Sequence, residues 1–93
     1  MNTSKKLEAR ALSYVERDKL IEAGLDPVYV PVSDDASQAD MMKRNRQIAG
    51  WILRNILELT DEELNVIDDN VANELALDCM TLTIRGKEEE EKN

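Results

Sequence analysis

Apolar residues recur at spacings of three and four along two long stretches of the chain, which is the pattern of amphipathic helices. The first stretch predicts a helix from Gln38 to Leu59, with one face made of Met41, Asn45, Ile48, Ile52, Ile56 and Leu59. The second predicts a helix from Asp61 that Gly86 ends, with a stripe of Leu64, Ile67, Val71, Leu75, Cys79 and Leu82. Asp68 could begin a separate helix within the second stretch, but the stripe keeps its phase there, so we expect one helix or a slight kink.

Local start signals agree with these stretches and add a shorter helix. A serine or threonine followed three residues later by an acidic residue can cap a helix reciprocally, because each side chain accepts a hydrogen bond from the other's backbone amide. This capping box occurs at Ser13 and Glu16, at Ser37 and Asp40, and at Thr60 and Glu63. The first box predicts a helix from Tyr14 to Ala23, which Gly24 ends.

The segments around the helices are less regular. Residues 5–12 alternate between polar and apolar like a strand, yet their types favour a helix, so both interpretations stay open. Pro27 and Pro31 predict an extended connector whose valines lie against the core as a strap. Gly50 in the middle of the long helix predicts a close approach by another helix, because a glycine there otherwise costs about 1 kcal/mol.

Composition supports a small helical domain. Aromatic side chains make up only 3% of the 93 residues, so the core must be aliphatic. The prevalence of leucine and alanine favours helices over strands. We expect a mainly α fold, a compact bundle of three to four helices with an extended proline-containing connector and a disordered acidic C-terminal tail. Residues 1–86 form the helical domain and residues 87–93 the flexible tail.

Negative charge is concentrated in the last third of the chain. Residues 1–59 hold nine basic and nine acidic side chains, whereas residues 60–93 hold three basic and eleven acidic ones, which accounts for the net charge of −8. An acidic chain repels phosphates, so we expect no nucleic-acid partner. No stretch approaches the roughly 18 apolar residues of a membrane span, and the polar first residues lack a signal-peptide pattern, so we expect no membrane partner either.

The chain offers few groups for catalysis. It has no histidine, which removes the usual general base and the commonest metal ligand. Its single cysteine, Cys79, lies on an apolar stripe, which favours a buried side chain over a reactive thiol. One unpaired cysteine is also typical of a reducing cytosol. We therefore expect no enzymatic activity, no metal and no cofactor.

If the protein acts by binding a partner and not by catalysis, the long helix is the candidate binding surface. We expect its partner-binding residues to be Met41, Met42, Lys43, Arg44, Ile48, Trp51, Ile52 and Arg54. Basic side chains form a stripe on this helix: Lys43, Arg44, Arg46 and Arg54. We favour internal complementarity for this stripe, which would face the acidic third helix or the acidic tail of another copy. An acidic partner protein is the second interpretation of this stripe, and nucleic acid is the third. Trp51 fits the core better than an exposed contact, and the wide apolar faces predict a homo-oligomer.

Three segments share their order with one known family. Leu12 to Leu20 has a leucine-serine pair followed by glutamate-arginine, and Gly50 to Leu57 reads glycine-tryptophan-isoleucine-leucine-arginine-asparagine-isoleucine-leucine. A threonine-capped acidic helix and a last helix ending at 77–83 follow them. In this order, over about 75 residues, the chain resembles the tail assembly chaperones of long-tailed bacteriophages.

The resemblance implies a specific task. Such chaperones are small helical proteins that cover the hydrophobic tape measure protein in the host cytoplasm until the tail tube assembles around it. A longer frameshifted product of the same gene is implied to recruit the tail tube protein. The rival interpretation is a small acidic regulator or inhibitor, encoded by a phage or plasmid, that binds one host protein.

Overall fold

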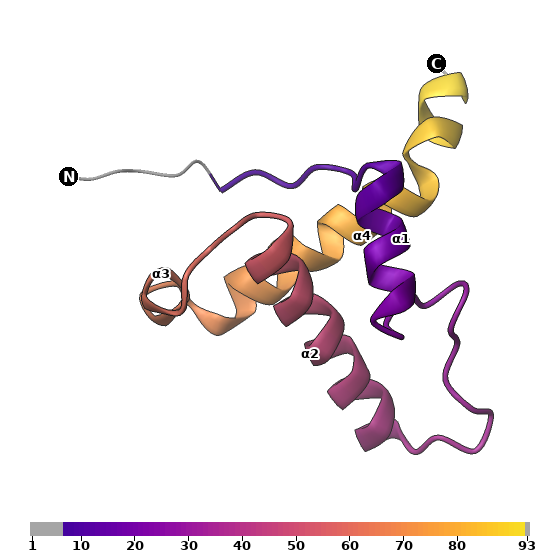
Figure 1. Cartoon of the computed structure of the whole chain (residues 1–93), viewed down its shortest axis with the longest axis horizontal. Coiled ribbons are helices and arrows are strands. Elements are labelled where there is room, and N and C mark those ends of the chain that lie inside the picture. Colours follow the sequence, from indigo (N-terminus) through magenta and orange to yellow (C-terminus); the bar gives the residue numbers. More distant parts are fainter. Residues whose placement is uncertain (1–6, 93) are drawn as a thin grey trace.

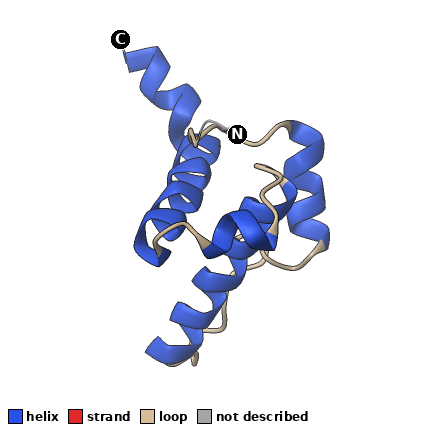
Figure 2. Cartoon of the chain, turned by 90° about the vertical axis from the view of Figure 1, so that its left-hand side faces the viewer, coloured by secondary structure: helices blue, strands red, loops and turns tan. Residues whose placement is uncertain are grey.

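Four helices make up the described part of the chain, and they confirm the mainly α prediction. The computed structural model describes residues 7–92, with side chains from Leu7 to Arg85. The helices are α1 (Tyr14–Glu22), α2 (Gln38–Asn55), α3 (Asp61–Asn65) and α4 (Asp69–Lys92). Figure 1 shows α4 running behind α1 and the end of α2, with the short α3 set apart at one side. The connections between helices are loops and turns throughout these residues, as the colouring of Figure 2 shows.

The predicted helix starts are confirmed by their hydrogen bonds. In all three capping boxes the hydroxyl accepts from the amide three residues on, and the acidic side chain accepts from the amide of the capping residue. The pairs are Ser13 with Glu16, Ser37 with Asp40 and Thr60 with Glu63. The predicted stop of α1 is also confirmed, because Gly24 has a φ of 77° and Leu25 donates back to the carbonyl of Leu20 at 3.2 Å.

The core lies mainly between α2 and α4. Its buried members are aliphatic apart from one cysteine: Leu12, Leu20, Ile48, Ala49, Ile52, Leu53, Ile56, Leu59, Ala72, Ala76, Cys79 and Met80. The aliphatic core and the burial of Cys79 are therefore as predicted. Small alanines on α4 let this helix lie close to the larger isoleucines and leucines of α2.

Helix α2 ends at Asn55, four residues before the predicted end at Leu59. The chain turns sharply there, since Glu58 has a φ of 58°, a left-handed conformation that is uncommon for a residue with a side chain. The amide of Leu59 donates to the carbonyl of Leu53 at 3.0 Å, which holds the turn. This turn buries Leu59 while leaving Thr60 extended, as the capping of α3 requires.

The single helix predicted over residues 61–82 is wrong. Helix α3 ends at Asn65, and α4 begins after Asp68, whose side chain accepts a hydrogen bond from the amide of Asn70 at 3.0 Å. A new helix therefore starts after Asp68, although the spacing of apolar residues continues unchanged through this position. At the break, Ile67 packs against the core while Val66 stays exposed. The predicted apolar stripe is therefore split between α3 and α4.

Residues 7–13 form neither a strand nor a helix, so both interpretations of that segment are wrong over the part described. Long-range hydrogen bonds hold it instead. The amide of Leu12 donates to the hydroxyl of Thr83 at 2.8 Å, and the guanidinium of Arg10 donates to the carbonyl of Ile56 at 3.1 Å. The segment is thus fixed by tertiary contacts, while residues 5 and 6 lie outside the described residues.

The connector is only partly the predicted strap. Pro27 to Tyr29 form a turn around Asp26, whose carboxylate accepts from the amides of Val28 at 2.8 Å and Tyr29 at 3.2 Å. Val28 is consequently exposed, whereas the valines at 30 and 32 are half-buried. The turn follows from the aspartate-proline pair, because an aspartate side chain readily accepts from amides two and three residues ahead.

The predicted helix stop at Gly86 is also wrong. Helix α4 passes through Gly86 and continues to Lys92. The flexibility predicted for residues 87–93 stays a prediction, because their side chains lie outside the described part of the chain.

Candidate partner-binding surface

The eight predicted contact residues all lie on α2, but they do not form one surface. Ile48 and Ile52 are buried in the core, with 4% and 0% of their area exposed. They lie on the side of α2 that faces α4 and the core, and Ile48 also lines a groove at the surface, so their role as contact residues stays a prediction. The remaining six residues fall into two groups, one near the start of α2 and one near its end.

The first group lies at the start of α2. Met41 and Met42 are 48% and 64% exposed, and Lys43 beside them is exposed. Met41 lines an apolar groove of about 210 Å³ between α2 and the connector, which we call the connector groove. Its lining residues are Pro27, Val30, Pro31, Val32, Met41, Arg44, Asn45 and Ile48.

Arg44 ties the connector to α2. Its Nη2 donates to the backbone carbonyl of Val30, and its Nε is buried without an acceptor among the described residues. The arginine thus acts as a wall of the connector groove and not as an exposed charge. A half-buried guanidinium bound to a backbone carbonyl keeps the two sides of the groove together.

Two of the four side chains of the basic stripe bind acidic residues of the same chain. Arg46 lies 2.5 Å from the carboxylate of Asp69 at the start of α4, and Arg54 lies 3.0 Å from that of Asp61 at the start of α3. These pairs agree with the favoured interpretation, internal complementarity. All four side chains of these two pairs are exposed, so each pair contributes only about 0–1 kcal/mol to stability.

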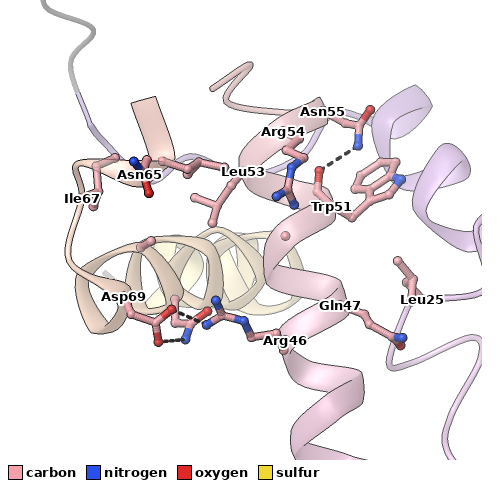
Figure 3. A pocket seen from close by; sticks show the side chains of 14 residues that line it. Leu25, Arg46, Gln47, Trp51, Leu53, Arg54, Asn55, Asn65, Ile67 and Asp69 are labelled. Carbon is pink, nitrogen blue, oxygen red and sulfur yellow. Dashed lines mark hydrogen bonds and ion pairs between the residues drawn. The ribbon is translucent and has the colours of Figure 1, made fainter. Parts of the chain in front are cut away.

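Trp51 is neither a core residue nor a fully exposed one. It packs against the edge of the core and lines a second, larger groove of about 740 Å³ between α2, α3 and the start of α4. Figure 3 shows this groove with Trp51, Arg54 and Leu53 on α2 and with Asn65, Ile67 and Asp69 on the opposite wall. We call it the Gly50 groove, because Gly50 forms part of its α2 wall.

The close helix approach predicted at Gly50 does not occur within the chain. A Cβ atom built on Gly50 would meet only the Nη1 of Arg54, at 2.9 Å, apart from its own helix backbone and chain neighbours. The glycine therefore faces an open groove that the side chain of Arg54 partly covers.

Sequence reasoning missed the buried ion pair between Arg17 and Asp26. The Asp26 side chain is fully buried, and its Oδ2 accepts from the Nε of Arg17 at 2.8 Å. Burial by itself raises the pKa of Asp26, but the hydrogen bonds from Arg17 and from two backbone amides hold the pKa below its ordinary value. The aspartate-proline turn was a usable signal, whereas nothing in the sequence pairs this aspartate with Arg17.

A second missed pair anchors the first described residues to α1. Both oxygens of Glu16 accept from the guanidinium of Arg10, each at 2.9 Å. The bond from Arg10, together with the bond from the amide of Ser13, lowers the pKa of Glu16 to about 2. Both missed pairs involve α1, and the pair of Arg17 with Asp26 adjoins the connector groove, because Asp26 directly precedes Pro27.

The described residues include no group of three or more histidine, cysteine, aspartate or glutamate side chains placed to hold a metal ion. Burial raises the pKa of the Cys79 thiol. Of the helices described, none combines the length and the apolar character needed to cross a membrane.

Known proteins add no family to this description. No protein family, no curated protein and no solved structure was found to match the chain. The two grooves of α2 are therefore the features from which a function can be argued.

Proposed function

We propose that this protein is a tail assembly chaperone of a long-tailed bacteriophage. In the host cytoplasm it would cover apolar stretches of the tape measure protein by hydrophobic contact, until the tail tube polymerises. It would do so without enzymatic chemistry and as a homo-oligomer. In a longer product it would also bind the tail tube protein.

The observation that supports this proposal is the exposed methionine pair beside the connector groove. Methionine side chains are flexible and polarisable, so they adapt to apolar partners of varied shape. The prolines and valines of the connector extend this apolar surface without adding a charge. Such a surface suits a client that offers many similar apolar segments and no single fixed epitope.

Co-expression with the tape measure protein of a long-tailed bacteriophage tests the proposal. We expect the two proteins to co-purify, and the double variant Met41→Ser, Met42→Ser to recover about fivefold less client, because hydrophobic contact scales with the apolar area removed from water. Val15→Ser is the matched control, since Val15 is exposed on α1 and lies in neither groove. Circular dichroism of each variant verifies the fold.

Two results would contradict the proposal. One is failure of the unaltered protein to co-purify with the tape measure protein. The other is capture of one stoichiometric host protein from lysate, which would favour the regulator or inhibitor interpretation. Light scattering after size exclusion tests the homo-oligomer separately.

A further inference from the structure

The Gly50 groove has the size and the lining of a binding site. Its volume of about 740 Å³ falls in the range of about 300–1,000 Å³ that is typical of ligand sites. Apolar side chains lie within it, among them Trp51, Leu53, Leu64 and Ile67. Polar side chains accompany them: Arg46, Gln47, Arg54, Asn55, Asn65, Asp69 and Asn73. Apolar surface accompanied by amides and charges is typical of a protein interface.

The helical glycine indicates what kind of element can enter. A glycine has no side chain, so another helix can approach its backbone closely. Within the described part of the chain, no other helix comes within 4 Å of the position that a Cβ of Gly50 would take. A partner helix could therefore lie against α2 here, with Trp51 as a large apolar anchor of the kind that dominates binding energy at interfaces.

The two arginines of the groove determine the charge of that partner. Arg54 uses its Nε to bind Asp61, while its Nη1 lies over Gly50. Arg46 binds Asp69 through its Nη1. Both guanidiniums are exposed and have further N–H donors, so a carboxylate from a partner can bind them bidentately. Movement of Arg54 onto such a carboxylate would also uncover Gly50.

We propose that the Gly50 groove binds an amphipathic helix of a partner protein whose apolar stripe is flanked by glutamate or aspartate. The apolar side chains would lie against Trp51 and Ile67, which are both half-buried and line the groove. The flanking carboxylates would bind Arg46 and Arg54. This inference rests on the proposed function in that the partner is a segment of the client, and it specifies a second contact on the other side of α2 from the connector groove.

Trp51 makes the proposal directly testable, because it is the only tryptophan of the chain and lies in the groove. The probe is a synthetic tryptophan-free helical peptide with a leucine stripe flanked by glutamates. We expect it to change the Trp51 fluorescence saturably. Glutamine in place of the glutamates should weaken binding about tenfold, because hydrogen bonds between charged groups are the stronger ones, and lysine should abolish it.

Variants of the protein separate the groove from the rest of the chain. Gly50→Leu fills the groove while keeping a good helix former, so we expect the fold to persist and peptide binding to be lost. Arg54→Gln should weaken binding about fivefold by removing the charge of one contact. Lys19→Gln is the matched control, because Lys19 is an exposed basic residue of α1 that lines neither groove, and it should leave the affinity within about twofold.

Four outcomes would overturn the groove proposal. The first is the absence of a saturable change in Trp51 fluorescence with the glutamate peptide, and the second is equal affinity for the lysine peptide. The third is retained peptide binding by a folded Gly50→Leu variant. The fourth is a change in Trp51 fluorescence when the protein alone is diluted, which would make a second copy of the chain the occupant. Binding of the glutamate peptide without recovery of the tape measure protein would support the groove and contradict only the proposed function.

Discussion

The Nε of Arg17 on α1 lies 2.8 Å from the Oδ2 of Asp26, a fully buried carboxylate that also accepts from two backbone amides of the connector turn. The arginine lies in addition over the ring of Tyr29, 5.1 Å from its centre. One ion pair therefore joins the helix, the turn and the first residues of the connector. The connector in turn forms one wall of the connector groove.

Removal of Arg17 should destabilise the protein more than removal of both partners. Arg17→Met leaves an uncompensated buried carboxylate, for which we expect a loss of about 3 kcal/mol in the free energy of unfolding. The double variant Arg17→Met, Asp26→Asn should recover part of that loss, because the buried charge is gone. Urea denaturation of the two single variants and the double variant measures the coupling. Equal stability of Arg17→Met and the unaltered protein would contradict this role.

Acid should weaken the protein through Glu16. Its pKa is lowered from 4.5 to about 2 in the folded state, mainly by Arg10, so the stabilisation is present above the unfolded value. It is lost as the pH falls from about 4.5 toward 2. Glu16→Gln removes the titrating group while a glutamine can keep the capping box. We expect the unfolding free energy of the variant to decrease less between pH 5 and pH 3 than that of the unaltered protein. Urea denaturation at the two pH values measures this difference. Parallel curves for the two proteins would contradict the prediction.

Alanine should have opposite effects at two glycines. Gly50→Ala should stabilise the protein by about 0.5–1 kcal/mol, because glycine is a poor residue in a helix interior and the flexible Arg54 side chain can move aside. Gly24→Ala should destabilise it by about 1 kcal/mol, since an alanine at a φ of 77° is strained. Thermal unfolding followed by circular dichroism compares the two. A destabilised Gly50→Ala would mean that Arg54 cannot move, which would also weaken the case for partner entry at Gly50.

Cys79 should be protected from thiol reagents in the folded protein. Its side chain is fully buried in the core, and burial raises its pKa, so both access and thiolate formation are disfavoured. We expect reaction with a chromogenic disulfide to be slow in buffer and fast in urea. Ile52→Ala, which opens a cavity in the same core, should accelerate the reaction in buffer. Rapid labelling of the unaltered folded protein would show that the core opens more easily than its packing indicates.

The parts of the fold that sequence predicted depend on short-range hydrogen bonds. Ser13, Ser37 and Thr60 each start a helix because the acidic residue that completes the cap lies three positions away, whatever the rest of the chain does. Gly24 ends α1 for an equally local reason, its positive φ. The aliphatic core followed from the low aromatic content of the chain, and the burial of Cys79 followed from periodicity, because an apolar stripe tends to face away from water.

Tertiary structure decided the features that distant residues control. Periodicity could not show that α2 would end at Asn55, because Leu59 is buried through a turn and not through a further helical turn. It could not pair Arg17 with Asp26, since this contact depends on how α1 meets the connector. Nor could it separate core from contact residues on α2. Ile48 and Met41 share one sequence pattern, and only the position of α4 buries the first and leaves the second exposed.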